Sequence, residues 1–306
     1  MKDRVTQIDI KHGISVKDLT DQMFQTGAFN GGRMGFACQI YREMIQDNAV
    51  TKFLSVSGAL ISAGLQKTLL QIVENSMVDA IISTGAILTH DLLEDLGEHH
   101  LRLEPGVDDQ ELRKRGINRI FDVAATDSGF ERMEKYLLNL MEREFASQPD
   151  RPVPTHEFLR VLGSGMSSGS FLGAAVRKGI PVFCPAITDS MLGVHVLSFA
   201  ETTGFKLDPV GELKKIISLA FDAKKTGALV LGGGVPKNYA FQACLVSGKT
   251  LDYAIQITMD RPEHGGLSGA SLDEAISWGK ISTKGKMVTV VADVTIALPI
   301  LVASVI

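Results

Sequence analysis

Cysteine is scarce in this sequence and follows no pattern. The 306 residues contain three cysteines, Cys38, Cys184 and Cys244, which is an odd number without close spacing. Such a set builds neither the disulfide framework of a small secreted protein nor a cysteine-rich zinc site. We therefore expect three small core residues in a reducing cytoplasm, and no metal site.

An excess of positive charge and long apolar runs are also missing. The 31 Lys and Arg residues are outnumbered by 35 Asp and Glu residues, and a net charge of -4 argues against a nucleic-acid partner. The longest apolar run, near the C-terminus, is interrupted by Asp293 and Pro299, so it falls short of the ~20 residues that span a bilayer. The start, MKDRVTQIDIKHGI, lacks the apolar core of a secretory signal. The sequence thus predicts a cytoplasmic protein without a membrane or nucleic-acid partner.

What the sequence does contain is an alternation of short apolar segments with amphipathic helical ones. Several of the apolar segments have no polar face, which is typical of a parallel sheet with helices on both sides. The length admits one large domain or two ordinary ones. The expected strands are residues 52–58, 78–84, 181–186, 228–231, 252–258 and 287–293.

Three segments are expected to be irregular. The glycines of residues 27–32 predict a turn between two helices, and the GAI of residues 85–87 predicts a turn between a strand and a helix. Residues 98–128 are charged and weakly patterned, which predicts an insertion. We expect its adjacent His99 and His100 to be exposed to solvent rather than to bind a metal.

In a parallel sheet, ligands bind where the carboxyl ends of the strands meet the loops. The small and polar positions expected at this edge are Ser57–Ser62, Thr84–His90, Thr188–Asp189, Gly232–Gly234, Met259–Asp260 and Asp293. The glycine run does not match the G-x-G-x-x-G fingerprint of dinucleotide-binding proteins. A tight turn without a ligand would have the same sequence there.

The segment SLDEAISWGK, residues 271–280, gathers three chemically useful side chains. Glu274 and Trp278 are four residues apart and so share a face of a helix, where a carboxylate and an aromatic ring suit an organic cation. Gly279 then ends the helix and lets Lys280 turn toward that face. A lysine amine in such a site can act as a nucleophile, although a lysine at a helix C-terminus is also what the helix dipole favours.

The same segment carries a family resemblance. VLGGGVPKN, DYAIQIT, GGLSGASLDEAISWGK and VVAD, in this order, resemble the deoxyhypusine synthase family. SGALISAG, MVDAIISTGAILTHDLLEDLG and FCPAITDSMLG extend the likeness upstream, so that it runs from about Phe53 to the end. The resemblance implies a Rossmann-like α/β fold with one large domain over residues 1–306, on which the helical residues 1–50 pack. It also implies a homotetramer, a dimer of dimers, with active sites at subunit interfaces.

The resemblance implies a reaction as well. Family members use NAD to oxidise spermidine, attach its 4-aminobutyl group to an enzyme lysine, and pass it to a lysine of the translation factor 5A precursor. Lys280 matches the lysine that forms the imine. The positions that match the polyamine site are Asn238, Gly265, Gly266, Leu267, Glu274 and Trp278. The positions that match the NAD site are Gly58, Ala59, Leu60, Ile61, Ser62, Thr84, Gly85, Ala86, His90, Asp189, Gly233, Met259, Asp260, Asp293 and Val294.

This chain differs from the eukaryotic members of the family at four positions of the expected active site. Those members have a glutamate at His90, a histidine at Asn238, and aspartates at Val194 and Leu267. Fewer carboxylates are then available to hold a polyamine. The sequence also does not identify the residue that transfers the proton, for which His90 and His264 are candidates. The compact length resembles archaeal and bacterial members.

Three functions remain compatible with these residues. The first is a deoxyhypusine synthase of archaeal type. The second is an aminobutyltransferase similar to homospermidine synthase, which would use the same NAD chemistry but a free diamine as acceptor. The third is a non-catalytic NAD-binding paralogue that regulates a partner subunit; retention of Glu274, Trp278 and Lys280 argues against it, because a regulatory subunit has little need of a nucleophile.

Overall fold

The computed structural model describes residues 4–147 and 150–306. These residues form two compact units, each made of segments that are not contiguous in the sequence. Unit 1 consists of residues 4–57, 76–82 and 214–306. Unit 2 consists of residues 58–75, 83–147 and 150–213. Among the described residues, no helix combines the length and the apolar character needed to cross a bilayer.

Unit 1 is built on parallel strands in the order β11-β10-β9-β1-β2. β1 pairs with β9, β9 with β10 and β10 with β11, all in parallel. Apolar side chains such as Leu54, Val230 and Ile255 are buried along these strands. The strands are β1 (Val50–Val56), β2 (Ala80–Ser83), β9 (Lys225–Leu231), β10 (Leu251–Thr258) and β11 (Ile281–Val291). The predicted α/β class with a mainly parallel sheet is confirmed.

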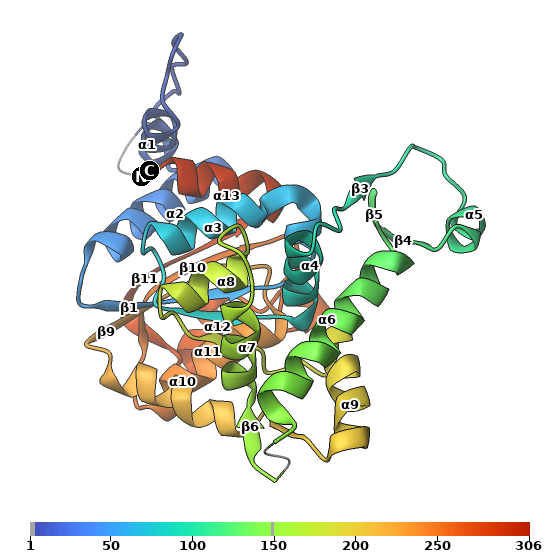
Figure 1. Ribbon diagram of the computed structural model, residues 1–306. Helices are drawn as coiled ribbons and strands as arrows, with labels where there is room; N and C mark the ends of the chain where they lie inside the picture. Colours follow the sequence, from blue (N-terminus) through green and yellow to red (C-terminus); the bar gives the residue numbers. More distant parts are fainter. Residues whose placement is uncertain (1–3, 148–149) are drawn as a thin grey trace. The chain divides into compact units, whose positions relative to one another are not determined.

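Helices cover both faces of this sheet. In Figure 1, α2 and α13 lie on one face of the sheet and α11 lies on the other. The C-terminal apolar segment is a strand followed by a helix, and Asp293 caps that helix, α13, by accepting from the Thr295 backbone N–H at 2.7 Å. The helices of unit 1 are α1 (Val16–Thr26), α2 (Phe29–Gln46), α10 (Gly211–Asp222, whose first residues belong to unit 2), α11 (Gly234–Val246), η2 (Pro262–His264), α12 (Leu272–Ser277) and α13 (Val294–Ala303).

The turn between α1 and α2 is shorter than predicted. Gly27 caps α1 in the left-handed conformation, and α2 begins at Phe29, so most of the predicted turn at 27–32 is helical. The prediction was wrong because it treated every glycine as a turn residue. A Cβ on Gly32 would lie 2.3 Å from the backbone of Gly27, and one on Gly35 would lie 2.2 Å from the backbone of Phe24. These glycines therefore let two helices pack closely rather than break one.

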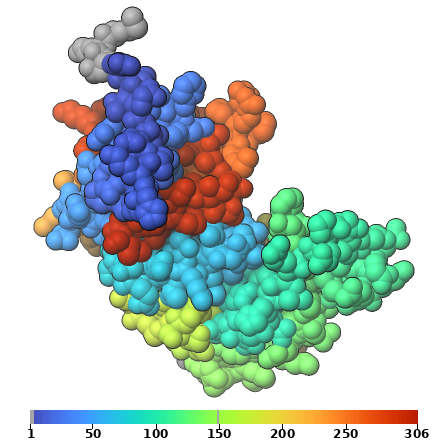
Figure 2. Space-filling view, turned by 90° about the horizontal axis from the view of Figure 1, so that it is seen from above, coloured from blue at the N-terminus to red at the C-terminus, as the bar shows by residue number. Residues whose placement is uncertain are grey.

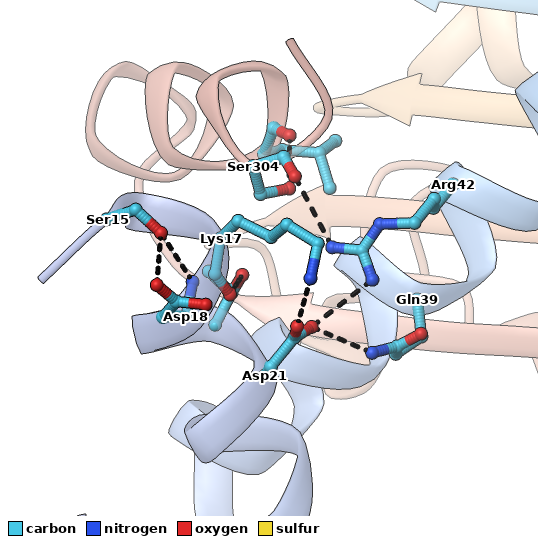
Figure 3. A network of polar contacts seen from close by, with 9 residues as sticks. Ser15, Lys17, Asp18, Asp21, Gln39, Arg42 and Ser304 are labelled. Carbon is cyan, nitrogen blue, oxygen red and sulfur yellow. Dashed lines mark hydrogen bonds and ion pairs between the residues drawn. The ribbon is translucent and has the colours of Figure 1, made fainter. Parts of the chain in front are cut away.

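A polar network joins α1, α2 and the C-terminal residues. Figure 3 shows Asp21 at its centre, where its carboxylate accepts from Lys17 Nζ at 2.7 Å and from Arg42 Nη1 at 3.2 Å. Arg42 Nη2 also donates to the Ser304 carbonyl at 3.3 Å. The blue α1 residues accordingly lie beside the red C-terminal residues in Figure 2.

Unit 2 is mainly helical. Its helix α4 begins at Gly85, so the predicted turn at 85–87 was wrong; Thr84 stands at the N-cap with extended backbone and the GAI forms the first helical turn. Its helices are η1 (Ile61–Leu65), α3 (Gln66–Glu74), α4 (Gly85–Asp95), α5 (Asp109–Lys114), α6 (Asp127–Phe145), α7 (Thr155–Ser164), α8 (Phe171–Arg177) and α9 (Met191–Thr203). Its strands are β3 (Leu101–Arg102), β4 (Ile117–Ile120), β5 (Val123–Thr126), β6 (Pro152–Pro154), β7 (Val182–Phe183) and β8 (Lys206–Asp208).

The charged insertion contains regular structure that the sequence did not predict. β3, β5 and β4 form an antiparallel sheet in that order, with β4 and β5 joined by a short turn. Figure 1 shows this sheet and α5 next to the start of α6. The strands are two to four residues long and mostly half-exposed. Their alternation of apolar and polar residues is therefore too short to be recognised as a pattern.

A buried carboxylate ties three elements of unit 2 together. Asp91 on α4 is fully buried, and its oxygens accept from Gln66 Nε2 and Ser170 Oγ, both at 2.8 Å. They also accept from the backbone N–H groups of Phe171 at 2.9 Å and Leu172 at 2.8 Å, at the start of α8. Asp91 therefore provides the acceptor for otherwise unpaired N–H groups at a helix N-terminus.

Replacing Asp91 with alanine is expected to lower the free energy of unfolding by roughly 3 kcal/mol, because three buried donors and the half-buried Gln66 lose their acceptor. Urea denaturation followed by circular dichroism measures this change. The matched control is Asp95→Ala on the same helix. Within the described part of the chain, Asp95 accepts from Ser167 alone, near the surface, so the expected loss is about 1 kcal/mol. Equal losses in the two variants would contradict the assigned role of Asp91.

Candidate active site

A cavity of about 310 Å³ lies within unit 1, between α11, α12 and the loop that precedes α12. It contains the three side chains that the SLDEAISWGK segment predicts, Glu274, Trp278 and Lys280, together with Asn238 from α11. The complete lining is Lys237, Asn238, Phe241, Gln242, Leu267, Ala270, Ser271, Glu274, Ala275, Trp278 and Lys280.

The local sequence explains how Lys280 reaches this cavity. Ser271 caps α12 by accepting from the Glu274 backbone N–H at 3.1 Å, and α12 ends after Ser277. Gly279 takes a left-handed conformation with φ 69°, and the Lys280 N–H then donates back to the Ala275 carbonyl at 2.9 Å. The chain therefore reverses at Gly279, as predicted, before β11 begins at Ile281.

The Lys280 amine is held by two neighbours. Its Nζ donates to Asn238 Oδ1 at 2.9 Å and lies 5.6 Å from the centre of the Trp278 ring. Lys280 and Asn238 are half-buried, whereas the Trp278 side chain is exposed at the mouth of the cavity. An ammonium or amine above an indole ring is stabilised by cation–π attraction, and an amide oxygen fixes its direction.

A second lysine in the cavity was missed at the sequence level. Lys237 is only 4% exposed, and its Nζ donates to Gln256 Oε1 at 3.0 Å and to the Leu267 carbonyl at 3.3 Å. It also donates to the Ala270 carbonyl at 2.5 Å. Burial lowers the pKa of Lys237 to about 8, and the nearby positive charge of Lys280 acts in the same direction. The signal that could have revealed it is that Lys237 is the one charged residue of α11.

Lys237 and Gln256 together hold the loop over the cavity. Gln256 is fully buried on β10, and its amide nitrogen donates to the carbonyls of Ser268 at 2.8 Å and Gly232 at 3.1 Å. Lys237 holds the carbonyls on either side of Ser268, as described above. The loop is therefore fastened to the sheet by side chains rather than by strand pairing. This loop carries Leu267 into the lining of the cavity.

Five of the predicted cofactor residues lie in unit 1, after the adjacent parallel strands β9, β10 and β11. Gly233 precedes α11, Met259 and Asp260 follow β10, and Asp293 with Val294 begins α13. Because the carboxyl ends of parallel strands share one edge of the sheet, these residues gather there. A Cβ on Gly233 would lie 2.6 Å from Ser268 Cα, so only glycine fits between the strand and the loop.

The other ten predicted cofactor residues lie in unit 2. Gly58 has φ 87° and precedes the π-helical turn η1, in which Ser62 is buried. Thr84, Gly85 and Ala86 begin α4, which also carries His90. Asp189 is exposed in the loop before α9.

Some residues singled out from the sequence lie apart from the cavity. Gly265 and Gly266 are near it in sequence but do not line it. His264 is exposed and pairs with Asp260 at 2.7 Å. Val194 is an exposed residue of α9 in unit 2. The structure therefore brings Lys280, the predicted catalytic residue, together with four residues of the predicted substrate set, which are Asn238, Leu267, Glu274 and Trp278.

The prediction that both His99 and His100 are exposed was half wrong. His99 has a side chain that is 72% exposed, but the side chain of His100 is 5% exposed and hydrogen-bonded on both ring nitrogens. Two identical neighbours in a charged segment give no sequence signal for which one turns inward. No group of three or more His, Cys, Asp and Glu residues suited to a metal ion is found within residues 4–147 and 150–306.

Comparison with known proteins gives the family. The family model for deoxyhypusine synthase matches residues 18–305. A protein of Methanosarcina acetivorans named probable deoxyhypusine synthase 1 is 39% identical over 91% of this chain and 87% of its own length. A protein of Archaeoglobus fulgidus with the same name is 40% identical over 98% of this chain and 97% of its own length.

A solved structure with a similar fold is described as a deoxyhypusine synthase from Entamoeba histolytica. It matches with a TM-score of 0.68 at 19% identity and covers 98% of this chain and 96% of that one. At this identity the likeness concerns the fold. The extent of the family match and the archaeal relatives together establish that the chain belongs to the deoxyhypusine synthase family of transferases.

Proposed function

We propose that this chain uses NAD to transfer the 4-aminobutyl group of spermidine, through an imine on Lys280, to a lysine of the translation factor 5A precursor. The observation that carries the proposal is the placement of the Lys280 amine in one cavity with Glu274 and Trp278, where Asn238 orients it at 2.9 Å. A nucleophilic amine and a cation-binding carboxylate are the groups that polyamine transfer requires.

The cavity suits an elongated organic cation. The Glu274 carboxylate attracts an ammonium group, and the face of Trp278 attracts a second one. The side chains of Phe241 and Ala275 offer apolar surface to the methylene chain between the charges. A polyamine would thus lie along the wall that contains the reactive lysine.

Lys280 supplies the bond-forming atom. Its neutral amine attacks the imine carbon of the oxidised polyamine, a new C–N bond forms, and 1,3-diaminopropane leaves with a proton. The acceptor lysine then displaces Lys280 by the same exchange. Asn238 accepts a hydrogen bond from the amine but cannot take up a proton, so it orients Lys280 and another group removes the proton.

The residues at the sheet edge fit a dinucleotide by their chemistry. In unit 1, Asp260 and Asp293 at this edge offer carboxylates suited to ribose hydroxyl groups, and Gly233 allows the loop at Ser268 to approach the end of β9. NAD, when bound, accepts hydride from the polyamine and returns it after transfer. From the resemblance to the family, we also propose that the ten matching residues of unit 2 contact NAD.

We propose the homotetramer of the family for this chain. Among the residues that line the cavity in unit 1, Trp278 is 64% exposed and Leu267 is 47% exposed, so the cavity presents exposed apolar side chains. Exposed apolar side chains around a reactive site are typical of surfaces that a partner subunit covers.

A label-transfer assay tests the acceptor. The purified chain is incubated with NAD, spermidine labelled in its butyl group, and either the 5A precursor or putrescine. We expect label on the precursor and none on putrescine. A second candidate, a homospermidine-type aminobutyltransferase, is favoured by the apolar Leu267 and by Glu274 being the one carboxylate among the described lining residues. Label on putrescine alone would establish that alternative, and label on neither acceptor would favour a regulatory paralogue.

A further inference from the structure

Four side chains of unit 2, Ser62, His90, Glu94 and His100, form a hydrogen-bonded chain. His100 is at its centre, and its Nδ1 lies 2.6 Å from Glu94 Oε1. Its Nε2 lies 3.1 Å from Ser62 Oγ and 2.9 Å from His90 Nδ1. Ser62 and His90 are two of the residues that we assign to the NAD site. The chain therefore links a buried imidazole and a half-buried carboxylate to two side chains that we assign to the NAD site.

Counting hydrogens shows that this arrangement has two states. Glu94 accepts from His100, so Nδ1 of His100 carries a hydrogen. Nε2 then has either a lone pair or a hydrogen, and it makes one good hydrogen bond at a time. With a lone pair it accepts from the hydroxyl of Ser62 or from the Nδ1–H of His90. With a hydrogen it donates to the Nδ1 of His90 or to the Ser62 oxygen. The N–H of His90 and the hydroxyl hydrogen of Ser62 then stay available to another acceptor.

The surroundings favour a neutral His90 and an ionised Glu94. Burial lowers the pKa of His90 to about 4, and the nearby His100 acts in the same direction. Burial by itself raises the pKa of Glu94, but hydrogen bonds from His99 and His100 outweigh it and keep that pKa below its usual range. His100 is the member of the group with a hydrogen-bond partner at each ring nitrogen, so it is the one placed to carry an additional hydrogen.

We propose that Glu94 and His100 are a positioning pair whose proton sets the hydrogen-bonding of the NAD site. When His100 is protonated, His90 presents an Nε2–H and the Ser62 hydroxyl is free to donate. NAD offers phosphate, ribose and carboxamide oxygens, which are acceptors. NAD therefore selects the protonated pair, and its binding takes up a proton from solvent. This inference rests on the proposed function, because it requires NAD as the ligand.

Several other titratable groups lie on the elements around the pair. The groups that contact it are Glu94 and His90 on α4 and the exposed His99, while η1 contributes only the non-titrating Ser62. The elements packed against α4 also carry titratable groups that stay constant between the variants below. They are Asp91 and Asp95 on α4, Arg132 with Glu98 at α6, Arg177 on α8, and His195 on α9.

Calorimetric titration with NAD tests the proposal. Measurements on the purified protein in two buffers of different ionisation enthalpy give the number of protons exchanged on binding. We expect the wild-type protein to take up a fraction of one proton near neutral pH, and its affinity to fall as pH rises. In His100→Gln, affinity is expected to drop about tenfold, and both the proton uptake and the pH dependence are expected to disappear. Glu94→Gln keeps the imidazole in place and is expected to lose the same pH dependence.

The matched control is His99→Gln. His99 also binds Glu94, with its Nδ1 2.7 Å from Oε2, but it contacts neither Ser62 nor His90, so proton uptake should stay as in the wild type. A merely structural role of His100 would lower affinity without changing the proton count. Unchanged proton uptake in His100→Gln and in Glu94→Gln would overturn the positioning pair. If calorimetry detected no heat of NAD binding to the wild-type protein, the proposed function would be overturned, and this inference with it.

Discussion

Substitution of Lys280 by alanine or arginine is expected to abolish transfer of the butyl group, with a loss of at least about a thousandfold in rate, because no other amine occupies its position. Lys280 Nζ is the atom aligned by Asn238 and lying over Trp278. Lys237, the other lysine of the cavity, has its Nζ committed to three oxygen acceptors. Arginine keeps the positive charge but cannot form the imine. Comparing the two variants therefore distinguishes the effect of losing the nucleophile from the effect of losing the charge.

Borohydride trapping measures the intermediate directly. The protein is incubated with NAD and butyl-labelled spermidine, reduced, digested, and analysed by mass spectrometry. We expect the label on the peptide that contains Lys280 in the wild type and no label in either variant. Lys284→Arg is the control, since Lys284 is an exposed residue of the same strand β11. Label retained by Lys280→Ala, or found on another lysine, would refute the assignment.

Replacing Lys237 with methionine is expected to lower kcat/KM about a hundredfold, because the loop over the cavity loses a tie that positions the substrate. Methionine has a similar length but cannot donate to Gln256, Leu267 and Ala270. Hydrogen exchange read by mass spectrometry should show faster exchange in the loop residues 262–271. Lys224→Met, at an exposed position, is the control. Unchanged turnover together with unchanged exchange would contradict the role of Lys237 in holding the loop.

Lys237 also makes the stability of the wild-type protein depend on pH, and the methionine variant should lack this dependence. The pKa of Lys237 is about 8 in the folded protein, below the ~10.4 of an unfolded lysine. Between these values the unfolded chain binds more protons, so the free energy of unfolding gains a contribution as pH rises, and this contribution is lost as pH falls through 8. Urea unfolding at pH 7 and pH 9 should show a gain on the order of 1 kcal/mol in the wild type relative to Lys237→Met. An equal pH dependence of the two proteins would contradict the lowered pKa.

Much of the framework was predictable because its signals are local. Each of the six predicted strands coincides with an observed one, since apolar runs such as the one around Val230 are buried on both faces. Within α12 and its end, the spacing of Glu274 and Trp278 and the position of Gly279 place Lys280 without knowledge of any other segment. The wrong turn prediction at 27–32 arose because glycine occurs both in turns and where two helices pack closely. Gly32, which was expected in a turn, instead allows α1 and α2 to pack closely.

The sequence by itself determined the α/β class, the family and the position of Lys280 after the helix end at Gly279, because these depend on periodicity and on residues close together in the chain. Tertiary structure alone decided which polar side chains are withdrawn from water. Lys237 meets the carbonyl of Ala270, 33 residues away, and His100 meets Ser62, 38 residues away. A pKa and a hydrogen-bonding role arise from such partners and from burial, so no local pattern in the chain encodes them.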